Sequence, residues 1–309
     1  LINQVGATAT VSGNVAQLSN SGTLTLTGTT TGSARLDNFT SGVVTVDAGA
    51  SASFAGDIFN SGTAANAFTV NGSFSSGGLF INQSGANLLV GTTGTLSATN
   101  GITNASGATL VNNGTIASIV NNFGNFTSTG TLQNGLLNGA ITVTANLSGT
   151  VQGTINNSGT INVTTSGLLG EATFVQGGFG VLNFGGFDTG FGSIAGGGTI
   201  NLGLTTLNVG SNNTSTTFSG VINGPGRLFK TGTGTLTLSG VNGYTGETRI
   251  TGGTLALASG GQIAGLVRNG TVFTNAGTVS GSVVNLATLT SSGSISGGLS
   301  QFAGATATV

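Results

Sequence analysis

Hydroxyl and aliphatic side chains alternate in short runs along most of this chain. Thr235, Leu236, Thr237 and Leu238 form one such run, and residues 254–257 form another after a pair of glycines. A period of two predicts short strands with one buried face and one wet face. We find no apolar stripe with the helical period, and 59 glycines in 309 residues disfavour helices. The sequence therefore predicts an all-β fold.

A short unit recurs along the chain, in which an Asn or Ser and a Gly precede small polar residues that alternate with aliphatics. Copies read NSGTLTL (20–26), NNGTI (112–116), STGTL (128–132), NNSGTINV (156–163), TNAGTV (274–279) and SSGSI (291–295). Their spacing indicates a solenoid with roughly 20 residues in each coil. Gly and Asn suit the corners because they tolerate positive φ. Asn side chains at equivalent corners are expected to stack in hydrogen-bonded ladders.

One stretch of the chain, GPGRLFKTGTGTLTLSGVNGYTGETRITGGTLAL at 224–257, differs from the rest because it holds the only Pro, Lys and Tyr. This stretch resembles the passenger-associated transport repeat of Gram-negative autotransporters. The positions that match the repeat are Gly224, Gly226, Leu228, Lys230, Gly232, Gly234, Leu236, Leu238, Gly240, Asn242, Tyr244, Gly246, Ile250 and Leu255. The resemblance covers about a tenth of the chain. It implies an exported, right-handed parallel β-helix on the bacterial cell surface, in which the repeat assists secretion and folding.

We expect one continuous β-solenoid over residues 1–309, a single elongated rod of about fifteen coils. Within it we distinguish Asn/Gly-rich coils over 1–167, a Gly/Phe-rich segment over 168–198, the transport-repeat region over 199–257 and further coils over 258–309. The Gly/Phe-rich segment concentrates aromatic rings, namely Phe174, Phe179, Phe184, Phe187 and Phe191. Two interpretations stay open, because these rings would either stack inside the coil or form an exposed adhesive patch.

Charge is scarce, with five basic and six acidic residues and a net charge of −1. This balance argues against nucleic acid or an anionic membrane as a partner. The chain has no Cys and no His, which excludes disulfides, imidazole catalysis and the common zinc sites. Glu171 and Asp188 are the only carboxylates near one another in the middle of the chain. We therefore expect no enzymatic activity and no cofactor.

Three carboxylates, Asp37, Asp47 and Asp57, recur every ten residues near the start. In a coil of about 20 residues Asp37 and Asp57 would stack on one face, where paired carboxylates recruit Ca²⁺. The alternative is three solvated corner residues, and we assign no metal site.

Four charged residues of the transport-repeat stretch, Arg227, Lys230, Glu247 and Arg249, are expected to form exposed pairs across adjacent coils. The Tyr244 ring is expected to pack at a corner, with its hydroxyl group reaching water or backbone. We assign the folding core of this stretch to its inward aliphatics, Leu236, Leu238, Ile250, Leu255 and Leu257.

Thr-x-Thr pairs, such as Thr8 with Thr10 and Thr235 with Thr237, raise an ice-binding alternative. The pairs recur at no constant spacing along the sequence, so we expect no regular array of them.

The hexapeptide GATATV occurs at 6–11 and again at 304–309. This is either a coincidence between two degenerate coils or the sign of a tandem array whose unit has 298 residues, the offset from Gly6 to Gly304. Because Leu1 stands where an initiator Met would, we expect the chain to lie within a longer precursor. The translocator barrel that the resemblance implies would then lie outside this chain.

Taken together, these features favour an extracellular structural segment that acts as an adhesin stalk or as a self-associating surface fibre. Its partners would be other copies of itself, a host surface or a neighbouring cell. One alternative is a carbohydrate-binding adhesin. A less favoured one is a polysaccharide-degrading β-helix enzyme, which would need a groove with two converging carboxylates.

Overall fold

The computed structural model describes residues 1–165 and 170–309, and the regular elements of these residues are all β-strands. Strands pair in parallel with their equivalents in the next coil, so the fold is a parallel β-solenoid, as the alternating pattern predicts. The chain divides into two compact units, Leu1–Gln152 and Gly153–Val309.

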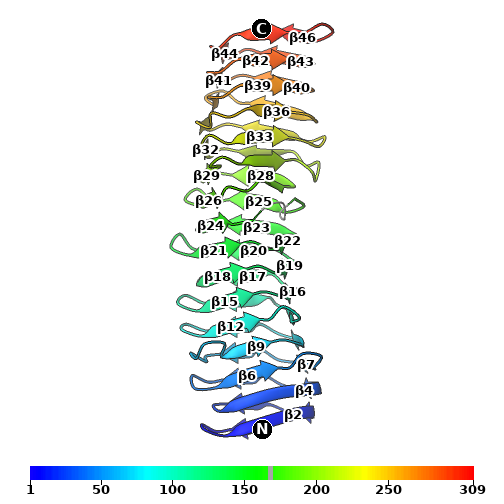
Figure 1. The fold of residues 1–309 in the computed structure, drawn as a ribbon, viewed down its shortest axis with the longest axis vertical. Helices are drawn as coiled ribbons and strands as arrows, with labels where there is room; N and C mark the ends of the chain where they lie inside the picture. Colours follow the sequence, from blue (N-terminus) through cyan, green and yellow to red (C-terminus); the bar gives the residue numbers. More distant parts are fainter. Residues whose placement is uncertain (166–169) are drawn as a thin grey trace. The chain divides into compact units, whose positions relative to one another are not determined.

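Three stacks of strands build the coils of the first unit (Figure 1). The first stack contains β1 (Ile2–Asn3), β3 (Leu18–Asn20), β5 (Leu36–Asn38), β8 (Ile58–Asn60), β11 (Phe80–Asn82), β14 (Ile102–Asn104), β17 (Val120–Asn122) and β20 (Leu136–Asn138). The other two stacks share their first two strands, the long strands β2 (Thr8–Val15) and β4 (Thr23–Gly32), because β4 pairs with both β6 and β7. The second stack continues through β6 (Val43–Val46), β9 (Phe68–Val70), β12 (Asn87–Val90), β15 (Thr109–Asn112), β18 (Asn125–Ser128) and β21 (Thr144–Leu147). The third continues through β7 (Ser51–Phe54), β10 (Ser73–Ser76), β13 (Thr95–Ala98), β16 (Thr115–Ile116), β19 (Thr131–Leu132) and β22 (Thr150–Val151).

The second unit is built in the same way. Its first stack contains β23 (Thr154–Asn157), β25 (Thr173–Gln176), β28 (Ser193–Gly196), β31 (Thr216–Phe218), β34 (Thr235–Leu238), β37 (Thr254–Leu257), β40 (Val272–Asn275), β43 (Thr288–Ser291) and β46 (Thr306–Thr308). A second series contains β24 (Thr160–Val163), β26 (Val181–Phe184), β29 (Thr199–Asn201), β32 (Val221–Asn223), β35 (Val241–Asn242), β38 (Gln262–Ile263), β41 (Thr278–Val279) and β44 (Ser294–Ile295). The third stack contains β27 (Thr189–Phe191), β30 (Thr206–Val209), β33 (Arg227–Lys230), β36 (Thr248–Ile250), β39 (Val267–Asn269), β42 (Val283–Asn285) and β45 (Leu299–Gln301).

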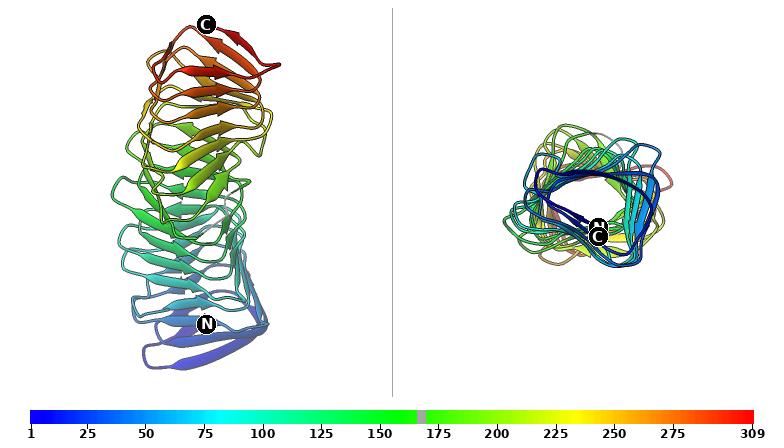
Figure 2. Two further views of the ribbon diagram at one scale, coloured as in Figure 1. Left: turned by 45° about the horizontal axis from the view of Figure 1, so that its top comes forward. Right: turned by 90° about the horizontal axis from the view of Figure 1, so that it is seen from below.

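Inward side chains of successive coils lie in register and form the core. In the first unit Leu24 pairs with Val44, and Val44 pairs with Phe68, and all three side chains are fully buried. The rings of Phe68 and Phe80 meet edge to face, with centroids 5.1 Å apart. Viewed along the stack, the coils form closed loops around this interior (Figure 2). Each coil therefore buries its apolar face against its neighbours rather than against a separate layer.

A ladder of buried asparagines follows the first stack of the first unit, as the sequence predicts. Each side-chain amide donates to the side-chain carbonyl oxygen of the next Asn, over 2.8 or 2.9 Å. Its members are Asn3, Asn20, Asn38, Asn60, Asn82, Asn104, Asn122 and Asn138. Successive members are between 16 and 22 residues apart in sequence. The ladder thus holds equivalent corners together while the loops between them change in length.

Glycines at the corners of the recurring unit are required by space rather than by positive φ. A Cβ on Gly130 would lie 2.0 Å from the carbonyl oxygen of Gly114, and one on Gly149 would lie 1.8 Å from that of Gly130. The φ angles of these glycines lie outside the left-handed region. Among the described non-glycine residues, only Asn66 and Asn213 have positive φ, at 57° and 61°. Twenty other described glycines do have positive φ, so the expectation of positive φ is confirmed at those turns, whereas in the recurring unit close stacking of the coils is what excludes a Cβ.

Candidate functional site

The transport-repeat strands lie in the middle of the second unit, and their aliphatic side chains point inward. Leu236 and Leu238 of β34 lie in register with Leu255 and Leu257 of β37, and all four are buried. Ile250 of β36 is also fully buried. The strands of this stretch thus contribute to the same continuous core as the coils around them.

Lys230 differs from the expectation, because its side chain is 1% exposed instead of lying on the surface. It occupies the inward position of β33, in register with Val209 before it and Ile250 after it. The ammonium group donates to the carbonyl oxygens of Thr231, Gly232 and Gly252, the last two at 3.3 and 3.2 Å. Burial lowers the pKa of this ammonium below its ordinary value. Backbone carbonyls from two neighbouring corners therefore hold this charge, and no ion pair to Lys230 occurs among the described residues.

The outward charges of the stretch also pair differently from the expectation. Glu247 forms an ion pair with Arg268, whose Nε lies 2.8 Å from Oε1 of the carboxylate. Arg249 lies over the ring of Phe229, with 5.8 Å between the guanidinium carbon and the ring centroid. Because β33 alternates, Arg227 and Phe229 face outward while Leu228 and Lys230 face inward. The predicted pairs among Arg227, Lys230, Glu247 and Arg249 are therefore wrong.

Tyr244 is fully buried, and its hydroxyl group meets the hydroxyl group of Thr248 instead of water or backbone. Burial raises the pKa of the phenol well above its ordinary value, and the hydrogen bond to Thr248 opposes this in part. The nearby Asn242 side chain is likewise buried, and its amide donates to the carbonyl oxygens of Gly240 and Gln262 at 2.9 and 3.1 Å. Its side-chain oxygen accepts from the amide of Ile222 at 3.1 Å. Asn242 thus connects neighbouring coils, whereas Tyr244 is paired within its own coil.

The Gly/Phe-rich segment divides its rings between the inside and the outside, while residues 168 and 169 at its start lie outside the described residues. Phe174, Phe184 and Phe191 are buried, and Phe174 stacks on Phe191 with centroids 4.7 Å apart. Phe179 is 84% exposed and Phe187 is 44% exposed. Neither interpretation of the segment holds for all five rings, because Phe174, Phe184 and Phe191 occupy inward positions of strands whereas Phe179 and Phe187 lie between strands.

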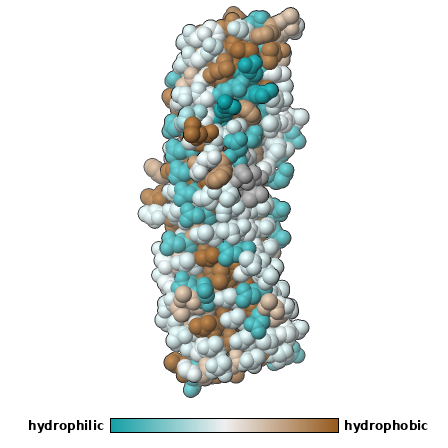
Figure 3. Space-filling view, in the orientation of Figure 1, coloured by the Kyte–Doolittle hydropathy of each residue, from teal (hydrophilic) through white to brown (hydrophobic). Residues whose placement is uncertain are grey.

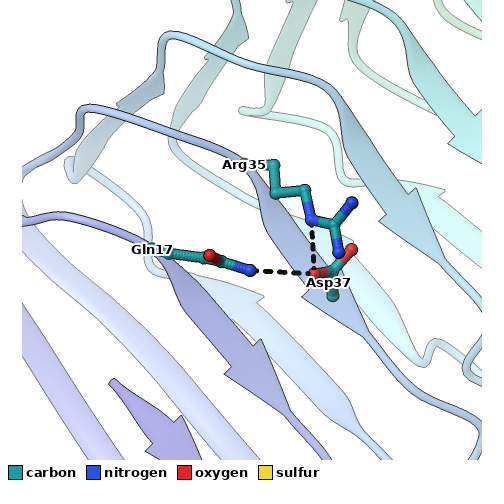
Figure 4. A network of polar contacts seen from close by, with 3 residues as sticks. All are labelled: Gln17, Arg35 and Asp37. Atoms are coloured by element: carbon teal, nitrogen blue, oxygen red, sulfur yellow. Dashed lines mark hydrogen bonds and ion pairs between the residues drawn. The ribbon is translucent and has the colours of Figure 1, made fainter.

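A polar cluster lies on the first unit, around Asp37 of β5 (Figure 4). Asp37 Oδ2 lies 2.8 Å from Nε of Arg35 and accepts a hydrogen bond from Nε2 of Gln17 at 3.3 Å. The Arg35 guanidinium lies over the ring of Phe59, 5.8 Å from its centroid. Sequence reasoning missed this cluster, although Arg35 is the only basic residue before residue 227.

The three early carboxylates do not form the stacked pair that a 20-residue coil would give. Asp37 lies in register with Phe59 because this coil has 22 residues, which moves Asp57 off the same position. Asp57 instead accepts a hydrogen bond from the amide of Leu79 at 2.8 Å. Asp47 directly follows β6, and its carbonyl oxygen accepts from the amide of Ala50. No group of three potential metal ligands gathers within residues 1–165 and 170–309.

Hydroxyl side chains of mixed Ser and Thr form a regular array on the third stack of the first unit, which the search for Thr-x-Thr pairs did not consider. Positions 29, 51, 73 and 95 lie in register, as do positions 31, 53, 75 and 97, and all eight are Ser or Thr. In both sets, successive members are 22 residues apart in the sequence. A search for Thr-x-Thr alone misses the array because five of its eight members are Ser.

Comparison with known proteins adds two similarities. The passenger-associated transport repeat family matches residues 228–257. Residues of this chain are 35% identical over 120 positions to the adhesin BmaC autotransporter of Brucella suis biovar 1 (strain 1330). That alignment covers 35% of this chain and 4% of the adhesin, so the chain spans a small part of this relative's length. No solved structure matches the chain.

Proteins with this passenger architecture are exported and displayed on the outer membrane of bacteria. In the residues that the structure describes, no helix is long and apolar enough to cross a membrane.

Proposed function

We propose that this chain, which fits an autotransporter passenger by its transport repeat, its adhesin relative and its parallel β-solenoid, is a structural segment of a surface adhesin. In this role it acts as a stalk or as part of a self-associating fibre. The observation that carries the proposal is the stack of parallel coils within each unit, braced in the first unit by a buried asparagine ladder, because such stacking makes a stiff surface segment. The adhesin relative supports a non-enzymatic role.

The surface supports association between copies because it carries little charge. The face of the molecule in Figure 3 is mostly of intermediate hydropathy, with scattered apolar and hydrophilic patches. Only 11 of 309 residues are charged, so neighbouring copies repel one another weakly. The array of Ser and Thr on β4, β7, β10 and β13 offers hydroxyl groups in register along the coil axis. We propose this face as the lateral contact between copies.

The two GATATV segments support the further proposal of a tandem array. In both, a turn with a left-handed glycine precedes a strand, with φ of 77° at Gly6 and 84° at Gly304. The amide of Ala7 donates to the carbonyl oxygen of Gln4 at 3.0 Å, and that of Ala305 donates to the carbonyl oxygen of Phe302 at 3.1 Å. Equal sequence in equal conformation is what a repeat of 298 residues requires.

Sedimentation velocity of the purified chain over a range of concentrations tests the self-association. We expect the wild type to associate as concentration rises, and the double variant Ser75→Asp, Ser97→Asp to remain monomeric because it places carboxylates on the proposed contact. A matched control is Ser84→Asp, Ser106→Asp, which adds the same charge at exposed positions outside the array. Association that is equal in all three proteins, or absent from the wild type, would overturn the lateral contact.

A further inference from the structure

A cleft of about 210 Å³ opens on the first unit beside the ring of Phe39. The cleft lies along a row of equivalent corner residues in successive coils. In each of them the backbone amide donates to the backbone carbonyl oxygen of a ladder Asn in the preceding coil; these residues are Ser21, Phe39, Ser61 and Gln83. Phe39 is 48% exposed and stands between two serines, so its large ring leaves a hollow over the smaller Ser61. The residues that line this hollow include Arg35, Asp37, Phe39, Phe59, Ser61 and Gln83.

The charges in the cleft compensate one another. The 2.8 Å contact between Arg35 and Asp37 leaves the cleft with no net charge, and it holds the guanidinium over the ring of Phe59. The ion pair joins the Nε atom of Arg35 to the Oδ2 atom of Asp37. The guanidinium nitrogens are donors and the carboxylate oxygens are acceptors, while the side-chain amide of Gln83 offers its Nε2 as a donor and already accepts from the hydroxyl group of Ser61 through Oε1.

This combination selects a class of ligand. An aromatic ring flanked by fixed donors and acceptors suits a pyranose, which presents C–H groups on one face and hydroxyl groups at its edge. An anion would meet the Asp37 carboxylate and a cation would meet the Arg35 guanidinium, so the balanced pair favours an uncharged sugar. A volume of about 210 Å³ is below the range of about 300–1,000 Å³ for drug-sized ligands, which fits one sugar ring rather than several.

We infer that this cleft binds a single pyranose unit of an uncharged polysaccharide, with Phe39 and Phe59 as the apolar contacts and with Arg35, Asp37 and Gln83 as the hydrogen-bonding groups. The inference rests on the proposed display of the chain at a cell surface, where such polysaccharides are met. It is independent of the lateral contact between copies, because the cleft lies on other strands than the hydroxyl array.

Isothermal titration of the purified chain with maltohexaose, cellohexaose and laminarihexaose tests the inference, and polygalacturonate serves as the anionic probe. The main variant is Phe39→Ser, a change that the corner accepts because Ser21 and Ser61 occupy equivalent positions. The matched control is Phe123→Ser, in the same row of corner residues but outside the cleft. We expect at least one neutral oligosaccharide to bind, Phe39→Ser to weaken it about tenfold, and Phe123→Ser to leave it unchanged.

Three results would overturn the inference: no neutral probe binds the wild type, Phe39→Ser binds as well as the wild type, or only polygalacturonate binds. Sedimentation velocity on the same samples separates this failure from failure of the proposed function. Loss of sugar binding with intact self-association would remove the sugar site alone, whereas a chain that does not associate would remove the lateral contact alone. Asp37→Asn provides a second variant, and it is expected to weaken binding because it removes the carboxylate acceptor and the ion pair that holds Arg35 over Phe59; unchanged binding in this variant would also count against the inference.

Discussion

The asparagine ladder makes the sharpest prediction about how the first unit is held together. In Asn82→Ala, the middle of the ladder loses both its donor and its acceptor. Wild-type Asn82 donates to Oδ1 of Asn104 at 2.9 Å and to the carbonyl oxygen of Thr109 at 2.9 Å, and it accepts from Nδ2 of Asn60 at 2.8 Å. All three Asn side chains are fully buried, so water does not replace the lost partners.

The expected cost follows from the groups that stay behind. Oδ1 of Asn104 loses its donor, and Nδ2 of Asn60 keeps only its contact with the carbonyl oxygen of Asn87 at 2.9 Å. A buried polar group without a partner costs about 1–3 kcal/mol, so two such groups cost about 3 kcal/mol or more. Because coils of a solenoid interact with their nearest neighbours, the loss is expected in the coils around residue 82 and not throughout the unit.

Hydrogen–deuterium exchange resolved by peptide mass spectrometry is the suitable assay, since it reports stability locally. A loss of about 3 kcal/mol corresponds to about a hundredfold faster exchange for the strands next to Asn82. The control is Asn113→Ala, which removes an exposed side chain that accepts from Thr129 at 2.9 Å. It is expected to change exchange little, because surface substitutions cost less than about 0.5 kcal/mol. Equal protection in Asn82→Ala and the wild type, or an equal loss in the control, would refute the role of the ladder.

Three further predictions concern the core, the corners and the buried phenol. Leu238→Asp is expected to lower the free energy of unfolding by more than about 3 kcal/mol, because it removes a buried aliphatic side chain and buries a charge. Thr237→Asp, on the outward face of the same strand, is expected to be tolerated. Limited proteolysis compares the two variants, and equal protease resistance would contradict the assignment of Leu238 to the core. Gly130→Ala places a Cβ 2.0 Å from a carbonyl oxygen of the preceding coil and is expected to destabilise the fold by about 1–3 kcal/mol. Gly178→Ala is expected to be neutral, because its Cβ would have no atom within 4 Å. Equal midpoints of urea unfolding for the two variants would contradict the steric role of Gly130. Tyr244 has a pKa raised from 10.0, so its stabilising contribution is present below pH 10 and is lost as pH rises through the higher folded-state value. As the only tyrosine, it makes tyrosinate absorbance a direct readout: the phenol should stay un-ionised well above pH 10 until the fold opens, and ordinary titration near pH 10 in folded protein would show that it is accessible.

Much of the fold could be predicted because the physical cause is local. Alternation of Thr and Leu in residues 235–238 fixes which face of the strand is buried, whatever the neighbouring coil contains. The same rule, applied strictly to β33, places Lys230 on the side of Leu228 and therefore inside. We expected Lys230 at the surface because isolated charges rarely lie in a core. The sequence does not show that the carbonyl oxygens of Gly232 and Gly252 accept hydrogen bonds from its ammonium group.

Which side chains meet in the Asp37 cluster and in the hydroxyl array depends on the number of residues in each coil, and this number cannot be read from the sequence. One coil of 22 residues puts Asp37 opposite Phe59, whereas one of 20 residues would put it opposite Asp57. The same uncertainty hides the array of hydroxyl groups, since its members at 51, 73 and 95 are Ser, Ser and Thr. Ladder contacts between coils settle these lengths, and those contacts are non-local.

Cryo-electron microscopy of the material that leaves the cells tests the proposal of a surface fibre most directly. We predict filaments whose density shows the strand spacing of about 4.8 Å along the axis and a longer period set by one 298-residue unit. Single particles tethered to the membrane, with the strand spacing but without the longer period, would contradict the fibre and the tandem array. Particles without the strand spacing would contradict the stacked coils themselves.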